Sequence, residues 1–298
     1  MQQIRIKKMF FSRKTVPYVF IFPFVLSFGL FFLYPVVSIV QMSFQSVLPG
    51  KVEFIGLENY RQLLNPTFFK AIKNSLLYMI IILAILIPVP MVLACIINSK
   101  KMVGKTLFKS ALFIPALTSV VVAGTIFRLS FAETAGALAN HIIGLFGMAP
   151  IKWLRNASTG FPVLIFLSFW RWIGINLLYF LSGLQSIPEE IYESADLDGA
   201  GAVKKFWYIS RPMLQPITTY VLTITIYGGL SMFTESYMLW SGNKSPNDMG
   251  LTIVGYLYRT GWEQNNMGFG AAIGVFLLAV TLILNAVQLK ISGRRENA

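Results

Sequence analysis

The sequence predicts an all-α integral membrane protein with six transmembrane helices, and three observations support this fold class. Of its 298 residues, 55% are hydrophobic and only 12% are charged, about half the roughly 25% of charged residues in soluble domains. Several apolar runs reach the ~20 residues that cross a bilayer as a helix. The net charge of +13 comes mostly from lysines and arginines between these runs, as the positive-inside rule predicts for membrane proteins.

Six apolar runs are interpreted as the spans. They cover 16–41, 74–97, 110–130, 161–183, 214–240 and 268–290. Pro88 and Pro90 are expected to kink the second run, because proline has no amide hydrogen to donate. Residues 1–15 form a basic N-terminus, and the first run is too long for the apolar core of a signal peptide. We therefore expect a single transmembrane domain over 16–298 and no soluble domain.

The basic residues also predict the orientation of the chain. Most lysines and arginines outside the spans fall in the segments that are cytoplasmic when the N-terminus is inside. An even number of spans returns the chain to its starting side, so both termini are expected in the cytoplasm. The segment between the fourth and fifth spans, 186–212, then faces the cytoplasm as well.

This segment, 186–212, is the densest charged stretch of the chain. It contains five of the 12 acidic residues, so it must leave the membrane. We predict that it docks a partner protein. The alternative is an ordinary amphipathic loop that lies on the lipid headgroups.

Local signals within the segment predict two short helices. Ser186 and Glu189 have the spacing of a capping box at a helix start. Gly199 is placed to end that helix in a left-handed turn. A second helix is expected over 202–210, and Pro212 is expected to prevent its smooth continuation. Two short helices at an angle would make a rigid element at the membrane surface.

The same segment contains the pattern E-x-A-x-x-x-G, then nine residues, then I-x-x-P. The matching positions are Glu193, Ala195, Gly199, Ile209 and Pro212. The pattern is similar to the EAA motif in the membrane subunits of binding-protein-dependent ABC importers. The Asp198-Gly199-Ala200 form looks like the sugar-importer branch. Ser194 and Arg211 replace a usual alanine and leucine, but the spacing is intact.

Other segments resemble the same sugar-permease family, and together they cover nearly the whole chain. They are Phe54–Tyr60, Phe108–Ser119 and Gly255–Ala272. Within the maltose-type carbohydrate-uptake permeases, the chain is most similar to Gram-positive arabinose, arabino-oligosaccharide or multiple-sugar permeases. The resemblance implies the type I ABC importer permease fold, a cytoplasmic coupling-helix loop over 186–212, and a location in the bacterial cell membrane.

The resemblance also implies partners. These are a second homologous permease, a dimer of ABC ATPases, and a lipid-anchored extracellular protein that delivers the sugar. ATP and magnesium would be bound by the ATPase, so this chain is expected to need no cofactor and to be no enzyme. The ATPase-coupling positions implied by the resemblance are Glu193, Ala195, Asp198, Gly199, Ala200, Ile209 and Pro212.

The residues themselves also argue against chemistry in this chain. Gly104-Lys105-Thr106 resembles the end of a phosphate-binding loop, but Ser99 stands where that motif needs its first glycine. A single histidine excludes multi-histidine metal sites, and a single cysteine excludes an internal disulfide. An intramembrane enzyme would need a catalytic pair, and the spacing supplies none. No catalytic or metal-binding residue is predicted.

A solute path is predicted around two ionisable residues inside spans, Arg171 and Glu235, because such residues usually face a cavity. Aromatic and hydrogen-bonding side chains surround both in sequence, and this combination suits sugars, which need polar partners within a mostly apolar pocket. The candidate path consists of Trp170, Arg171, Trp172, Asn176, Tyr227, Ser231 and Glu235.

These residues have alternative explanations. Trp170 and Trp172 could anchor the fourth span at the membrane interface. Arg171 could reach the headgroups or form a structural ion pair with Glu235. Glu235 could instead pair with the second permease.

The predicted function is therefore that of the permease subunit of an ATP-driven sugar importer. Two alternatives stay open: a permease for another solute, such as glycerol phosphate or a polyol, and a membrane scaffold that transports nothing. The identity of the sugar is not predicted, because selection is expected to rest largely with the separate binding protein.

Overall fold

A computed structural model of the chain describes residues 15–99 and 102–296, with side chains through residue 291. The predicted basic N-terminus lies outside these residues, except for Thr15. The structure is mainly helical and divides into two compact units. The first comprises 1–63 with 260–276, and the second comprises 64–259 with 277–298.

The first unit begins with a long apolar helix at the position of the first predicted span. Its parts are α2 (Val16–Phe28), the π-helical turn η1 (Gly29–Leu33) and α3 (Tyr34–Met42), 27 residues in all. The wide turn lies just before Pro35, where the missing amide hydrogen of proline interrupts the regular hydrogen-bond pattern.

A hairpin and a short helix follow, and the hairpin was not predicted. The elements are β1 (Gln45–Leu48), β2 (Lys51–Phe54) and α4 (Glu58–Gln62). The strands are antiparallel, with Val47 opposite Val52, and Pro49-Gly50 between them is a turn signal. The amide of Asn59 donates to the carbonyls of Ser43 and Gln45 at 3.0 and 2.9 Å, which holds α4 against the hairpin.

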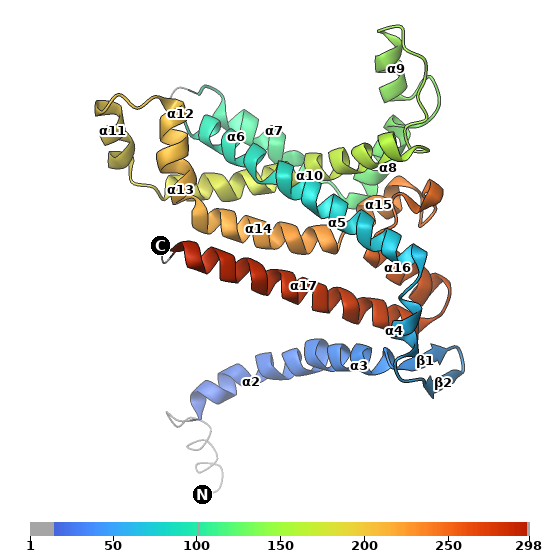
Figure 1. Ribbon diagram of the computed structural model, residues 1–298. Coiled ribbons are helices and arrows are strands. Elements are labelled where there is room, and N and C mark those ends of the chain that lie inside the picture. The colour runs from blue at the N-terminus through green and yellow to red at the C-terminus, as the bar shows by residue number, and fades with distance from the viewer. Residues whose placement is uncertain (1–14, 100–101, 297–298) are drawn as a thin grey trace, which may run out of the picture. The chain divides into compact units, whose positions relative to one another are not determined.

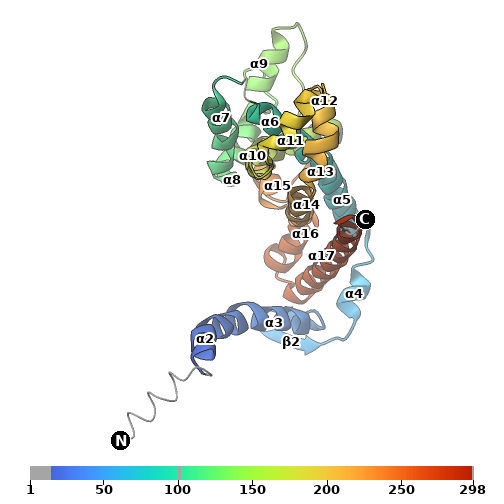
Figure 2. The same cartoon turned by 90° about the vertical axis from the view of Figure 1, so that its left-hand side faces the viewer.

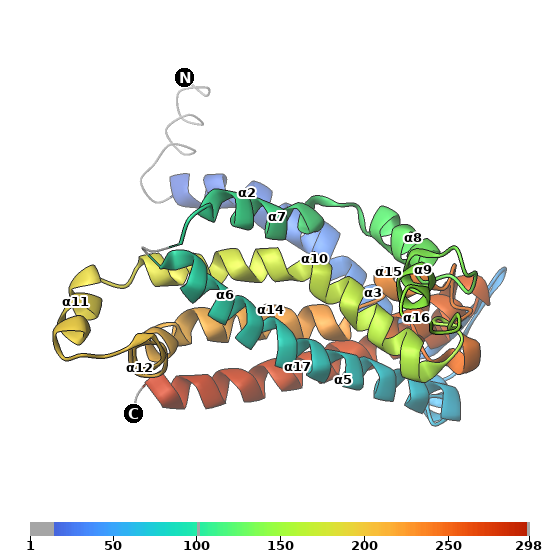
Figure 3. The ribbon, with the colours of Figure 1, turned by 90° about the horizontal axis from the view of Figure 1, so that it is seen from above.

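The second unit contains most of the remaining helices (Figure 1). Before the charged segment they are α5 (Pro66–Leu86), α6 (Pro88–Asn98), α7 (Lys105–Leu117), α8 (Val120–Ser130), α9 (Leu138–Gly144) and α10 (Ala157–Gln185). The second predicted span is interrupted at the expected prolines, because α5 ends before Ile87 and α6 begins at Pro88. Figure 3 shows α5 and α6 following one another, and α9 projects away from the other helices of this unit (Figure 2).

The C-terminal part of the chain consists of shorter helices and one long one. They are α11 (Glu189–Leu197), α12 (Ala202–Lys205), η2 (Phe206–Ser210), α13 (Arg211–Met213), α14 (Gln215–Leu230), α15 (Thr234–Leu239), η3 (Pro246–Asp248), α16 (Ile253–Tyr258), η4 (Arg259–Glu263) and α17 (Met267–Glu296). Helix α17 begins in the first unit and ends in the second.

Four helical stretches in the described residues are long and apolar enough to cross a membrane. They are Val16–Met42, Pro66–Asn98, Ala157–Gln185 and Met267–Ile291. The predicted third span corresponds to α7 and α8, which meet at 97° and make a fifth span if they cross together. The predicted fifth span is not one helix: α14 ends at Leu230 and α15 begins at Thr234.

Helix α10 is the centre of the second unit. It packs against α5, α6, α7 and α14, and Leu164, Leu167, Leu177 and Phe180 on it are completely buried. Gly174 allows α7 to approach, since a Cβ atom there would lie 2.1 Å from the carbonyl oxygen of Leu112. Polar residues on the buried faces of α10 therefore lie in an apolar interior, where they need partners.

Candidate functional site

The predicted docking element, which we call the coupling segment (186–212), forms two short helical pieces joined at a bend. They lie beyond the end of α10 in Figure 3. Gly199 has φ of +70°, the left-handed conformation that glycine adopts without strain. The amide of Ala200 donates to the carbonyl of Ala195 at 2.8 Å. The predicted glycine-terminated helix is therefore confirmed.

Side-chain contacts join the two helical pieces of the coupling segment to each other. The hydroxyl groups of Tyr192 and Ser210 are hydrogen-bonded at 2.9 Å, which joins α11 to η2. Partial burial raises the pKa of the Tyr192 hydroxyl above its ordinary value. Lys205 forms an ion pair with Asp196. The two pieces therefore behave as one element.

The coupling segment is anchored to the core at both ends. Ile187 and Leu214 are buried at its start and just after its end, in a cluster that includes Phe180 of α10 and Val221 of α14. A displacement of the segment must therefore act directly on α10 and α14.

One detail of the predicted segment is wrong, and another is confirmed. Ser186 does not cap α11: its hydroxyl donates to the carbonyl of Gly183 at 2.8 Å, because Ser186 still has the backbone conformation of the end of α10. Pro212 does prevent smooth continuation of the second piece, which passes through a wide turn before the proline and ends at Met213. The wide turn η2 precedes the proline, and the amide of Arg211 bonds to the carbonyl of Phe206, a geometry that accommodates the missing amide donor.

The motif residues form an accessible surface on this element. Glu193, Asp198, Gly199 and Pro212 are exposed, and Ala195, Ala200 and Ile209 are half-buried. Large apolar side chains are exposed beside them, including Leu197 (91%) and Tyr208 (81%). Apolar groups exposed beside charges, on a rigid support, are typical of protein-binding surfaces.

The second candidate region is the buried ion pair between α10 and α15. Nη1 of Arg171 lies 2.7 Å from Oε1 of Glu235, and the side chains are only 12% and 11% exposed. The guanidinium carbon of Arg171 lies 5.6 Å from the ring centre of Trp172. The structure thus favours an ion pair between Arg171 and Glu235 over an arginine that reaches the headgroups.

The other predicted path residues are more dispersed. Trp170 is half-buried and packs on Phe127, with ring centres 5.5 Å apart. The amide of Asn176 donates to the carbonyl of Trp172 at 3.0 Å. Tyr227 is 60% exposed on α14, and Ser231 is half-buried where α14 ends. Arg171, Trp172 and Glu235 are thus grouped, and Trp170 belongs to an apolar cluster.

The segment that follows α14 is called the capping segment (234–259). Gly228 and Gly229 left a helix break open as one interpretation of the sequence, and a loop with Gly242, Pro246 and Gly250 was expected, but the short helix α15 was not predicted. Thr252 donates from its hydroxyl to the carbonyl of Met232 at 2.7 Å, which satisfies the backbone at the break. Ser236 donates to the carbonyl of Gly250 at 2.6 Å. The backbone carbonyl of Met232, which the break leaves without a helical partner, is thus paired within the protein.

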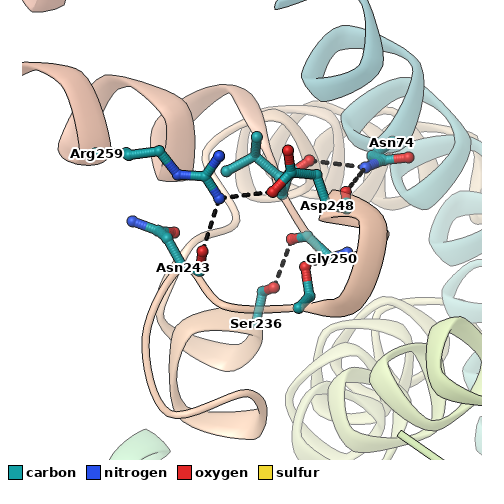
Figure 4. Close-up of polar contacts among 8 residues, drawn as sticks. Asn74, Ser236, Asn243, Asp248, Gly250 and Arg259 are labelled. Carbon is teal, nitrogen blue, oxygen red and sulfur yellow. Dashed lines mark hydrogen bonds and ion pairs between the residues drawn. The ribbon is translucent and has the colours of Figure 1, made fainter. Parts of the chain in front are cut away.

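Figure 4 shows the polar contacts that hold the loop of the capping segment. Arg259 donates to the Asp248 carboxylate and to the carbonyl of Asn243, both at 2.7 Å. Asn74 of α5 donates to the carbonyls of Asp248 and Leu251 at 2.8 and 2.9 Å. The sequence contains a turn signal, Pro246-Asn247-Asp248. Asn74, which holds this turn through the carbonyl of Asp248, lies 174 residues away in the chain.

Metal binding finds no support in the part of the chain that the structure describes, since no group of three or more His, Cys, Asp or Glu side chains is close enough to hold an ion.

Comparison with known proteins gives consistent matches along the chain. The model of the family described as binding-protein-dependent transport system inner membrane component matches residues 67–297. The chain is 54% identical to the arabinooligosaccharides transport system permease protein AraP of Bacillus subtilis, over 96% of this chain and 91% of the relative. It is 50% identical to AraP of Halalkalibacterium halodurans, over 97% and 91%.

A more distant relative and a solved structure extend these matches. The multiple sugar-binding transport system permease protein MsmF of Streptococcus mutans is 30% identical, over 89% of this chain and 91% of the relative. A chain from the crystal structure of a bacterial ABC transporter involved in the import of the acidic polysaccharide alginate has a TM-score of 0.85. It is 23% identical, over 97% of this chain and 99% of that chain, so this likeness shows a shared fold.

Proposed function

Because this chain belongs to the family of binding-protein-dependent transport system inner membrane components, we propose that it is the permease subunit of an ATP-driven importer of arabinose oligosaccharides. The observation that carries the proposal is the 54% identity to a permease of that name over 96% of the chain. The chain is a multi-pass membrane protein, and the proposed location is the bacterial cell membrane.

The proposed topology has six crossings, with both termini in the cytoplasm. Four are the long apolar helices, the bent pair of α7 and α8 makes the third crossing in chain order, and the broken pair of α14 and α15 makes the fifth. The distribution of lysines and arginines supports this orientation. It places the coupling segment in the cytoplasm and the capping segment on the outer side.

The proposed role of the coupling segment is to dock on an ABC ATPase, which binds ATP and magnesium. The docking positions are Glu193, Ala195, Asp198, Gly199, Ala200, Ile209 and Pro212. Rigidity supports this role, because the Tyr192–Ser210 hydrogen bond holds the segment together. Its buried ends at Ile187 and Leu214 would pass ATPase motion to α10 and α14.

The proposed path for the sugar runs along α10 and α14, between this permease and a second homologous one. Trp172 and Tyr227 expose their rings and would stack on sugar faces, and the half-buried Ser231 would supply a hydrogen bond. Asn176 is buried and bonded to Trp172, so its proposed role is to hold α10 behind the path. Trp170, Arg171 and Glu235 would form the wall behind them. An extracellular binding protein would deliver the sugar to this path.

Transport by the reconstituted complex tests this function. The two permeases, the ATPase and the binding protein are placed in vesicles, and uptake of an arabinose trisaccharide, a maltose-type trisaccharide and glycerol 3-phosphate is compared. ATP-dependent uptake of the arabinose trisaccharide is expected. Preferred uptake of glycerol 3-phosphate would favour the alternative permease function, and a complex that assembles but moves none of the three would favour the scaffold.

A further inference from the structure

We propose that Arg171 and Glu235 are positioning residues: their ion pair fixes the capping segment (234–259) to α10, and neither charge contacts the transported solute. The inference rests on the proposed function, because one of its consequences is measured as uptake. It replaces the simpler expectation that a charged residue inside a span marks a point of solute contact.

The geometry gives a solute little access to either charged group. The two groups are 2.7 Å apart and nearly buried, and a charge-assisted hydrogen bond is stronger than one between neutral groups. A sugar hydroxyl that bonded to Nη1 of Arg171 or Oε1 of Glu235 would replace this bond with a weaker one. It would also leave the other charge unpaired in an apolar interior, which is strongly unfavourable. Nε of Arg171 has no hydrogen-bond partner among the described residues, but it is buried as well.

The pair lies where the backbone alone holds α15 poorly. Glu235 is the second residue of α15, directly after the break at 231–233. The helical hydrogen-bond pattern does not continue through this break, and Phe233 has the non-helical values φ −144° and ψ −57°. A contact between Glu235 and α10 therefore fixes the start of α15 at the point where the chain leaves α14.

Hydrogen bonds and an ion pair join the parts of the capping segment to one another. Arg259 is bonded to both Asp248 and Asn243, and Ser236 is bonded to Gly250, so these contacts join α15, the loop and α16 (Figure 4). Fixing Glu235 therefore also positions groups further along the segment.

A matched set of variants separates positioning from solute contact. The variants are Arg171→Met, Glu235→Met, the double variant with both changes, and Arg128→Met as a control. Arg128 is an arginine of α8 that also contacts the capping segment, at Ser241, but in an exposed position. Each variant is assembled as the full complex, and uptake of the arabinose trisaccharide is measured with its KM.

Each single variant leaves one buried charge without its partner, so we expect uptake to fall at least tenfold. The double variant restores an uncharged, packed contact, and replacement of a buried ion pair by apolar residues is often tolerated. We therefore expect uptake within about threefold of the wild type and an unchanged KM. The Arg128→Met control is expected to match the wild type.

A distance measurement provides a readout that does not need transport. Cys95 is the only cysteine, so a Cys95→Ala background allows spin labels at Ser158→Cys on α10 and Lys244→Cys on the capping segment, both exposed sites. The single variants should broaden the distance distribution between the labels. The double variant should return it to that of the wild type.

The proposal is overturned if the double variant has the wild-type distance distribution but transports as poorly as the single variants, because the charges would then serve the solute. It is also overturned if the single variants keep wild-type distances. If the double methionine variant does not assemble, the exchanged pair Arg171→Glu with Glu235→Arg is judged by the same criteria. Failure of the wild-type complex to import the trisaccharide would contradict the proposed function instead, and the distances would still test the pair.

Discussion

The coupling segment and the capping segment differ in what holds them and in what they expose. Both consist of short helical pieces that follow a long helix. The coupling segment is held by contacts close in sequence, such as Tyr192 with Ser210, and exposes its motif residues. The capping segment is held by distant partners, such as Asn74 with Asp248, and buries Glu235 and Ser236. We infer that one is shaped to meet a partner and the other to close the permease itself.

The largest expected effect tests the rigid bend of the coupling segment. Gly199 has φ of +70°, which a β-branched side chain adopts only at a cost of about 1–2 kcal/mol or more. In Gly199→Val we expect uptake and sugar-stimulated ATP hydrolysis to be nearly abolished in vesicles. Gly201 has φ of −67° and open space around it, so Gly201→Val is the control. Equal activity of the two variants would contradict a role for the bend.

A second variant tests whether the surface of the coupling segment, rather than its shape, is what the partner recognises. Glu193 is exposed, and Glu193→Lys reverses its charge without disturbing the core. We expect at least a tenfold loss of ATPase binding, measured by co-purification, with unchanged thermal unfolding of the permease. Glu190→Lys reverses another exposed acidic residue of α11 outside the motif and should bind nearly normally. If both variants bind equally, the motif position has no special role.

A moderate effect is expected in the capping segment. Asn74→Ala removes two hydrogen bonds to backbone carbonyls, at Asp248 and Leu251. Leaving partly buried acceptors unpaired costs about 1–3 kcal/mol, so the thermal unfolding temperature of the purified permease should fall. Lys73→Ala, at the exposed neighbouring position, should leave it unchanged. An unaltered unfolding temperature in Asn74→Ala would show that the distant contacts do not hold this segment.

The smallest effect concerns the hydrogen bond inside the coupling segment. Tyr192→Phe removes the bond to Ser210 and should destabilise the segment by about 1 kcal/mol, which hydrogen exchange of α11 would detect. Because burial raises the pKa of Tyr192, its contribution to stability is complete below the ordinary tyrosine pKa of about 10 and is lost as the pH rises through the higher folded-state value. The phenylalanine variant should lack this alkaline loss.

Local sequence signals predicted the coupling segment better than any other region. The bend at Gly199 followed from one glycine at the end of a short helix, and the helix interruption before Pro88 followed from the missing amide of proline. The error at Ser186 arose because α10 extends to Gln185. A neighbouring element decided the outcome there.

The contacts of the capping segment could not be predicted, because many of them join residues far apart in the chain. Gly228 and Gly229 left a break open, but the run of apolar residues across 214–240 favoured a continuous span. The hydrogen bond from Thr252 to Met232 at the break could not be read from the sequence. The pairing of Arg171 with Glu235 was likewise one of several alternatives. The two residues are 64 positions apart, and the sequence does not show that their side chains lie close together. The sequence could single out Arg171 and Glu235 as ionisable residues inside apolar runs, but it could not identify their partners.

Cysteine cross-linking in the assembled complex tests the central claim most directly, namely that the coupling segment docks on the ATPase and the capping segment faces the other side of the membrane. In the Cys95→Ala background, Leu197→Cys and Lys244→Cys each place one thiol at an exposed site. We predict that Leu197→Cys cross-links to the ATPase, and that a membrane-impermeant thiol reagent added outside intact cells labels only Lys244→Cys. Labelling of Leu197→Cys from outside, without cross-linking to the ATPase, would contradict the account.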